Sequence, residues 1–332
     1  MLSTELTRRM GIDHPIVQAG MGDAAGRDLA AAVSNAGGLG TIGTIGRDVE
    51  QTQEEIAATR GMTDRPFSVN ILCFDWAPWA GDILDETMEA RPPSITLSFG
   101  DPGPGLAKCK SAGIPTLVQV QDNEGLRTAI AGGADVIIVQ GYEAGGHTGR
   151  RGTLNFVAQA LDLAGDIPVV AAGGVGNGRG LAAALAMGCA GVVMGTRFKA
   201  TPEYKGSAGE KQQIVESDGS NTIYDFILDE ALGIQWANGI SGRALRSPFT
   251  DEWEGRRMEL REKVATYPMW GFVIELAEKG QGINWAGESS ALVDRVRPAA
   301  EIVSETVAEA EALLARVSQL ISRTPVGSKS HR

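Results

Sequence analysis

A histidine lies in the glycine-rich stretch "VQGYEAGGHTGRRGT", directly after an apolar run. This residue, His147, is one of only three histidines in the chain. An imidazole exchanges protons near neutral pH, so a histidine can act as a general base. Gly145 and Gly146 let a substrate approach the backbone, whose N–H groups can receive developing negative charge. The stretch therefore predicts proton abstraction by His147, and its alternative is an exposed loop histidine without a role.

Glu143 precedes this histidine in the same stretch. Its carboxylate can act on a substrate directly, or it can bind the backbone or the neighbouring Arg150 and Arg151. The sequence leaves these alternatives open.

Other polar and glycine residues follow further apolar runs. At the ends of these runs lie Ala19, Gly20 and Met21 (first run), Asn70 (third), Gln119 (fifth), Gly173 and Gly174 (seventh), and Gly195 and Thr196 (eighth). A buried asparagine needs hydrogen-bond partners from the backbone or a ligand, whereas Gln119 can face inward or toward solvent. The glycine-rich turns after the last two runs lead toward helix N-termini, which predicts a phosphate-binding site.

The elements that position these residues form a regular series. The apolar runs cover residues 15–20, 39–43, 67–72, 94–100, 115–121, 135–141, 167–174 and 191–195. Most are continuously apolar, as parallel strands are when both faces of the sheet are covered. Helical patterns separate them, and an open doubly wound sheet would usually stop at five or six strands. The series therefore predicts a (βα)8 TIM barrel, in which all the candidate residues lie at the C-terminal mouth.

The regular alternation of apolar runs and helical patterns ends after residue 199. Residues 200–285 are more polar and contain four of the six tryptophans, Trp236, Trp253, Trp270 and Trp285. We expect this segment to be a helical insertion or lid after strand eight. Apolar residues spaced at three and four predict a final helix over residues 298–322. The expected domains are a barrel of residues 1–199 and 286–332 and a lid of residues 200–285.

Composition narrows the class of protein. The 332 residues carry a net charge of −11, which argues against a nucleic-acid partner. Cys73, Cys109 and Cys189 lack metal-ligand spacing, so we expect free buried thiols and no metal site. No apolar run approaches about 18 residues and no signal segment is evident, so a cytoplasmic protein without membrane contact is expected.

Several motifs together resemble the nitronate monooxygenase (2-nitropropane dioxygenase) family. They are "PIVQAGMG", "LAAAVSNAGGLGTIG", "RPFSVNI", "GYEAGGHTG", "PVVAAGGVGNGRGLAAALAMGCAGVVMGTRFKAT" and the late "WAGE". The resemblance implies an FMN-dependent TIM barrel that oxidises alkyl nitronates or nitroalkanes with O2 to a carbonyl compound and nitrite. His147 matches the base.

The resemblance also implies where FMN binds. Gly173, Gly174, Gly195 and Thr196 would hold the phosphate. The isoalloxazine would lie near Ala19, Gly20, Met21, Asn70, Gln119, Gly145 and Gly146. A small-molecule substrate and O2 are the expected partners. Whether the protein forms a homodimer is left open.

Two positions depart from the family pattern. Many members carry proline where this chain has Gly20, and Gln is frequent where it has Glu288. Related NADH:quinone reductases and enoyl-ACP reductases share parts of these motifs. An NAD(P)H-dependent flavin reductase acting on quinones or enoyl thioesters is therefore the alternative function, and a non-catalytic barrel that binds a phosphorylated ligand is a third.

Overall fold

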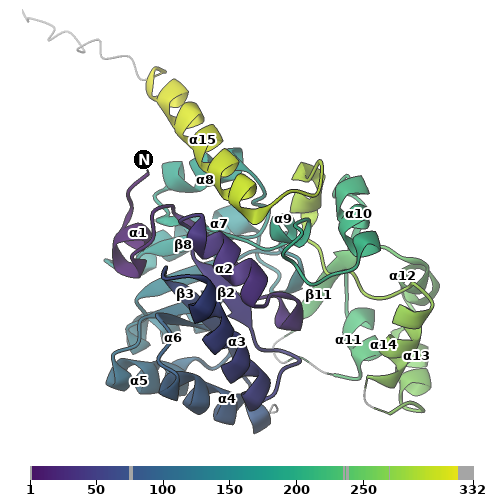
Figure 1. Ribbon diagram of the computed structural model, residues 1–332. Coiled ribbons are helices and arrows are strands. Elements are labelled where there is room, and N and C mark those ends of the chain that lie inside the picture. The colour runs from purple at the N-terminus through teal and green to yellow at the C-terminus, as the bar shows by residue number, and fades with distance from the viewer. Residues whose placement is uncertain (1, 75–77, 235, 237–238, 269, 321–332) are drawn as a thin grey trace, which may run out of the picture.

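Eight parallel strands form a closed barrel in the computed structural model, which describes residues 2–74, 78–234, 236, 239–268 and 270–320 (Figure 1). The strands are β1 (Ile16–Gln18), β2 (Gly40–Gly43), β3 (Phe67–Cys73), β4 (Ser94–Gly100), β5 (Thr116–Val120), β6 (Val136–Gln140), β8 (Val169–Ala172) and β9 (Gly191–Met194). They are paired in the order β1-β9-β8-β6-β5-β4-β3-β2. A parallel bridge between Val17 and Leu39 joins β1 to β2 and completes the ring. The predicted TIM barrel is confirmed.

Helices cover the outside of the barrel (Figure 1). They are α2 (Arg27–Asn35), α3 (Val49–Met62), α4 (Pro78–Glu89), α5 (Gly103–Ala112), α6 (Asn123–Gly132), α7 (Thr153–Leu163) and α8 (Gly178–Met187). The predicted C-terminal helix is α15 (Ala299–Ser318), which packs on α8 and α2 through Ile302, Val303 and Val307. Its predicted residues 321 and 322 lie outside the described residues.

The barrel interior follows from strand alternation. In β5, Leu117 belongs to the inner cluster and Val118 to the outer one, so Gln119 points inward again. Helix α1 (Glu5–Met10) closes the opposite end, where Leu6 joins the inner cluster. Arg9 donates to the backbone carbonyls of residues 135 and 166, which precede β6 and β8. The inner cluster thus forms an apolar core inside the barrel, and Gln119 lies toward the mouth.

Residues 200–285 contribute further helices beside the mouth of the barrel. They are α10 (Ala208–Glu216), α11 (Ile227–Leu232), α12 (Pro248–Trp253), α13 (Arg257–Val264) and α14 (Gly271–Glu278). Phe249, Trp253 and Phe272 are buried together in one hydrophobic cluster. The segment also contains two strands, β10 (Thr222–Asp225) and β11 (Ser241–Leu245), besides the expected helices.

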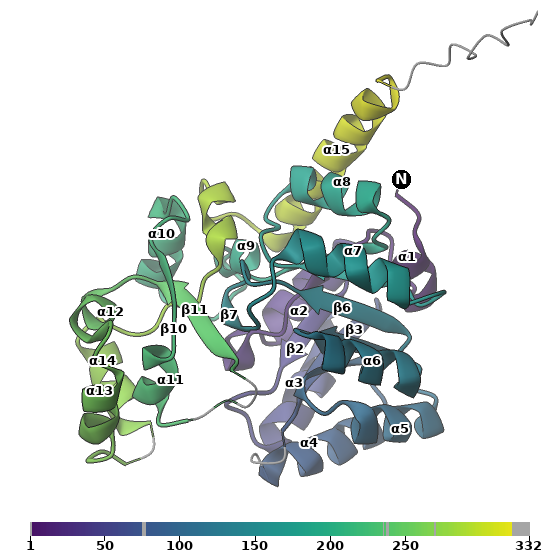
Figure 2. The same cartoon turned by 180° about the vertical axis from the view of Figure 1, so that it is seen from behind.

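The glycine-rich stretch that we expected to be a loop contains a strand, β7 (Gly146–Thr148). It pairs antiparallel with β11, and His147 lies opposite Gly242. Figure 2 shows β10, β11 and β7 between the barrel and the helices of the insertion. Local sequence did not predict this strand because its pairing partner lies far along the chain. His147 is consequently held in a sheet.

Three further features concern the cysteines, the lengths of the helices and the side chains that could bind a metal ion. All three cysteines are free; Cys109 and Cys189 are buried and Cys73 is half-buried. Among the described residues, no helix has the length and apolar character needed to cross a bilayer. Within the same ranges, no cluster of three or more His, Cys, Asp or Glu side chains is placed to hold a metal ion.

Candidate active site

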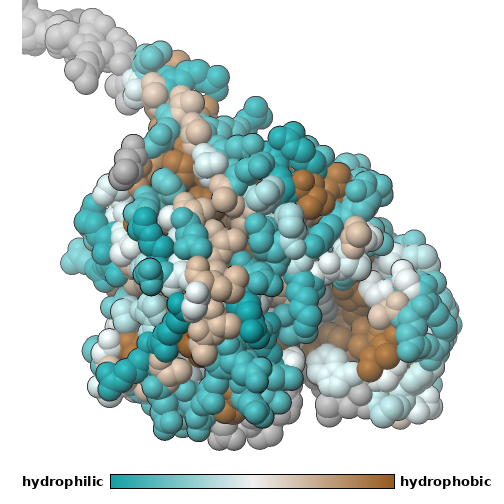
Figure 3. All heavy atoms as spheres, viewed as in Figure 1, coloured by the Kyte–Doolittle hydropathy of each residue, from teal (hydrophilic) through white to brown (hydrophobic). Residues whose placement is uncertain are grey.

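A cavity of about 590 Å3 opens at the C-terminal ends of the barrel strands. All twelve predicted site residues line it: Ala19, Gly20, Met21, Asn70, Gln119, Gly145, Gly146, His147, Gly173, Gly174, Gly195 and Thr196. The insertion contributes Leu232, Ile234 and Trp270 to its wall. In Figure 3, apolar surface lies in the recess between the barrel and the insertion. The fold therefore brings residues from the ends of the barrel strands and from the insertion into one cavity beside a partly apolar recess.

His147 is fixed by contacts on several sides. Its Nε2 lies 2.5 Å from Oδ1 of Asp229, which belongs to α11 of the insertion. The Trp236 ring stacks on the imidazole with centroids 3.7 Å apart, and the Trp285 ring is tilted against it at 4.9 Å. The His147 side chain, which follows two glycines in the sequence, is thus held in one orientation at the cavity wall.

Amide side chains form a polar group at the ends of β3, β5 and β6. Asn70 Nδ2 donates to Ser98 Oγ at 2.7 Å and to the Thr96 carbonyl at 3.2 Å, which leaves its Oδ1 as an acceptor. Gln119 Nε2 donates to Oε1 of Gln140 at 3.2 Å. Gln140 also lines the cavity, and sequence reasoning missed it although it ends the sixth apolar run. These amides give the cavity floor both donors and acceptors.

The glycine turns after β8 and β9 lie on another side of the cavity. Gly173 and Gly174 adopt φ values of +103° and +73°, a region that favours glycine. A Cβ on Gly195 would lie 3.4 Å from Cβ of Ala19, so the turn after β9 touches the end of β1. Gly287 N donates to Thr196 Oγ1 at 2.9 Å, which leaves the hydroxyl proton of Thr196 free to be donated elsewhere. Such a pair of turns suits an anion.

A family model of nitronate monooxygenases matches residues 3–309. The chain belongs to the nitronate monooxygenase family. It is 30% identical to a nitronate monooxygenase of Paraburkholderia phytofirmans over 93% of this chain and 96% of the relative. Membership makes it an oxidoreductase of a flavin-dependent family. The resemblance inferred from the motifs is confirmed.

Another relative is named for a different activity. A (3aS,4S,5R,7aS)-5-hydroxy-7a-methyl-1-oxo-octahydro-1H-indene-4-carboxyl-CoA dehydrogenase of Rhodococcus jostii is 45% identical to 61% of this chain. The match spans 56% of the length of that relative. The relatives of this chain thus have names that refer to quite different substrates.

Solved structures of similar proteins agree with the fold. FabK from Thermotoga maritima has a TM-score of 0.85 and 31% identity, covering 97% of this chain and 100% of that one. Nitroalkane oxidase from Streptomyces ansochromogenes has a TM-score of 0.80 and 28% identity, covering 96% of this chain and 100% of that one. Both similarities extend across the barrel and the insertion.

In this member of the nitronate monooxygenase family, Gly20, where many members carry proline, packs directly against Asn70. A Cβ on Gly20 would lie 2.6 Å from Cβ and 2.8 Å from Oδ1 of Asn70. The loop after β1 therefore passes directly over the Asn70 amide. A glycine is needed because real Cβ atoms do not approach other heavy atoms so closely.

The two glutamates have structural partners. Glu143 Oε2 accepts from both the backbone N–H and the hydroxyl of Thr153, at the start of α7, and Oε1 accepts from the same N–H. Glu288 lies 3.4 Å from the guanidinium of the buried Arg243. Neither glutamate lines the cavity. For Glu143, the structure supports the alternative in which it binds the backbone.

Lys199 is a buried cation that sequence reasoning missed. It follows Thr196 on the short helix α9 (Thr196–Lys199), lines the cavity and donates to Asn284 Oδ1 and the Trp285 carbonyl, both at 2.7 Å. Burial lowers its pKa to about 8. Its bond to Trp285 connects the turn after β9 to the aromatic wall beside His147.

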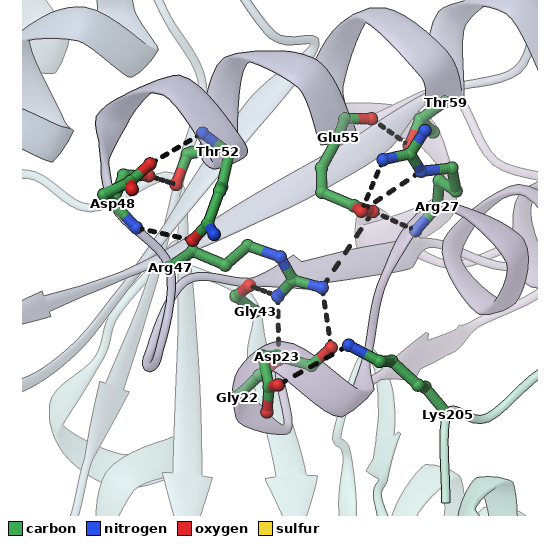
Figure 4. A network of polar contacts seen from close by, with 11 residues as sticks. Gly22, Asp23, Arg27, Gly43, Arg47, Asp48, Thr52, Glu55, Thr59 and Lys205 are labelled. Atoms are coloured by element: carbon green, nitrogen blue, oxygen red, sulfur yellow. Dashed lines mark hydrogen bonds and ion pairs between the residues drawn. The ribbon is translucent and has the colours of Figure 1, made fainter.

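Arg47 holds the loop after β1 (Figure 4). Its buried guanidinium donates to the carbonyls of Gly22, Gly43 and Asp23. Glu55 lies 4.0 Å away and is bound mainly by Arg27. Burial alone would raise the pKa of Glu55, but the hydrogen bonds from Arg27 and the positive charges of Arg47 and Arg27 together lower it. This network fixes the segment that carries Gly20 and Met21 over the cavity.

Proposed function

We propose that this protein is an FMN-dependent enzyme that oxidises alkyl nitronates, or nitroalkanes, with O2 to a carbonyl compound and nitrite, with His147 as the base. The observation that carries the proposal is the placement of His147. It lies in the wall of a cavity, fixed by Asp229 and Trp236, within a family of flavin-dependent oxidoreductases. Deprotonation of a carbon acid needs such a base at a defined position.

The residues present fit FMN. The phosphate would be held by Gly173, Gly174, Gly195 and Thr196, where left-handed glycines and a spare hydroxyl proton are available. The isoalloxazine would lie near Ala19, Gly20, Met21, Asn70, Gln119, Gly145 and Gly146. Gly20 packs closely on Asn70, whose Oδ1 can accept from a ring N–H. When bound, the flavin supplies the electron acceptor for the substrate.

The residues of the chain handle the proton and the charge. His147 removes the proton from the carbon that carries the nitro group, and the negative charge that develops on the nitro oxygens can be received by backbone N–H groups of the 145–146 turn. A preformed nitronate needs no deprotonation. The reaction balances when two nitronates and one O2 yield two carbonyl compounds and two nitrites.

Purified protein saturated with FMN tests the proposal. In air, ethylnitronate or propionate 3-nitronate should consume O2 and release nitrite, and under anaerobic conditions either should bleach the flavin absorbance. Absence of nitrite with every nitronate tried at saturating FMN would overturn the proposal.

A second candidate function is suggested by the Rhodococcus relative, whose name specifies an acyl-CoA substrate. In that case the flavin would exchange electrons with a CoA thioester or with NAD(P)H. Anaerobic addition of NADH, before any nitronate, separates the two: bleaching within seconds favours a reductase, whereas an unchanged spectrum followed by bleaching with nitronate favours the monooxygenase.

A further inference from the structure

We propose that Asp229 is a positioning residue that holds His147 in the tautomer with its proton on Nε2, so that Nδ1 is the atom that accepts the proton of the substrate. The tautomer assignment stands on geometry, and its catalytic consequence rests on the function proposed above. Asp229 is separated from His147 by 82 positions and belongs to the insertion. The inference therefore gives the insertion a part in the chemistry.

The surroundings of Asp229 show what the carboxylate does. It is 3% exposed, Oδ1 lies 2.5 Å from His147 Nε2, and Oδ2 accepts from Ser241 Oγ at 2.9 Å. Ser241 begins β11, the strand that pairs with β7 and carries Gly242 opposite His147. A buried carboxylate requires partners, and this one divides its two oxygens between a hydroxyl and the imidazole. The insertion thus fixes both the backbone and the ring of His147.

The chemistry of the partners decides the tautomer. An ionised carboxylate only accepts hydrogen bonds, so Nε2 must carry a proton to bond with Asp229. In a neutral imidazole the other nitrogen is then unprotonated. His147 lines the cavity and keeps 11% of its side chain exposed, so Nδ1 is the nitrogen that remains for a substrate. After proton transfer, the imidazolium would be paired with the carboxylate, as in other acid–histidine pairs.

Two aromatic rings complete the orientation. Trp236 stacks on the imidazole at an interplanar angle of 17°, and Trp285 packs against it at 40°. These contacts hold the plane of the ring, but they do not distinguish its two nitrogens. The choice between the tautomers is therefore left to Asp229.

Nitrogen NMR tests the assignment without any substrate. The chain has only His14, His147 and His331, so the His147 imidazole of 15N-histidine-labelled holoenzyme is identified by the signals that a His147→Gln sample lacks. At about pH 9, well above the ordinary range of imidazole titration, the His147 ring should carry its proton on Nε2. In Asp229→Asn the amide can donate as well as accept, so a measurable fraction should shift to the Nδ1–H form. A wild-type ring protonated on Nδ1 overturns the inference.

Kinetics separate positioning from a general structural role. In Asp229→Asn, kcat/KM for neutral nitroethane should fall by about 10²-fold, whereas that for preformed ethylnitronate should change by no more than about threefold. FMN affinity should stay unchanged. Equal losses with both substrates would mean that Asp229 only supports the fold, and would overturn the inference.

Glu230 offers a matched control, since it is a buried acid on the same helix that pairs with Arg257 and Arg261. Glu230→Gln makes the same chemical change one residue away. It should leave the His147 tautomer unchanged, and the ratio of kcat/KM for nitroethane to kcat/KM for ethylnitronate should stay as in the wild type. A Glu230→Gln effect equal to that of Asp229→Asn overturns the inference. If the tautomer is as stated but no nitroalkane or nitronate reacts, the proposed function fails and the tautomer assignment is supported.

Discussion

Gly20 lies so close to Asn70 that a Cβ on the glycine would sit 2.6 Å from the Cβ of the asparagine. Asn70 in turn donates to Ser98 and to the Thr96 carbonyl on the next strand. The loop after β1 and the ends of β3 and β4 are therefore one packed unit. This contact occurs at the position where the chain departs from many of its relatives.

Gly20→Ala should weaken flavin binding. The added methyl must displace the Asn70 amide, and overpacking of this kind costs about 1–3 kcal/mol, which corresponds to a roughly 5- to 150-fold rise in Kd. Fluorescence titration of FMN into the apoprotein measures the loss. Gly61→Ala is the control, because a Cβ at that exposed helical position meets nothing within 4 Å. Unchanged affinity in Gly20→Ala would contradict the expected placement of the isoalloxazine.

His147→Gln should separate the two forms of the substrate. Loss of the base should lower kcat/KM for neutral nitroethane by about 10²–10⁴-fold and affect preformed ethylnitronate much less. Nitrite release from each substrate, at a matched flavin content, gives the comparison. A variant that keeps wild-type activity toward nitroethane would show that His147 is not the base.

Arg47→Leu should destabilise the protein and loosen the loop after β1. Three backbone carbonyls, of Gly22, Gly43 and Asp23, would lose a charged donor, which costs about 3 kcal/mol or more. Urea unfolding measures the change. The exposed pair Arg65–Asp13 supplies a comparison, since Arg65→Leu should cost less than about 1 kcal/mol. Equal costs for the two variants would argue against a role for the Arg47 network.

Lys199 should make stability rise with pH in a defined window. Burial lowers its pKa to about 8, below the ordinary 10.5. Between these values the unfolded chain holds a proton that the folded protein has released, so this residue makes folding more favourable as pH increases. The free energy of unfolding of wild type, minus that of Lys199→Met, should therefore increase from pH 8 to about pH 10. A difference that stays flat or falls would contradict the assignment.

The local sequence was sufficient to predict the barrel and to predict which residues lie at its mouth. Continuous apolar runs with helical patterns between them predict parallel strands, because each run is covered on both faces. In such a barrel the strand ends share one mouth. The sequence alone therefore predicts that Asn70, Gln119, His147 and the glycine turns lie together there. All of these residues line the cavity that the structure contains.

The surroundings of His147 depended on the tertiary structure. Asp229 and Trp236 reach it only because β11 of the insertion pairs with β7, and nothing in the local sequence around either residue specifies that pairing. Lys199 was missed for the same reason, since its partners Asn284 and Trp285 lie 85 and 86 positions away. The sequence by itself determined the barrel, its mouth and the candidate base, because these follow from periodicity and strand order. Only the tertiary structure decided which groups fix the base, because contacts between distant segments depend on how the whole chain packs.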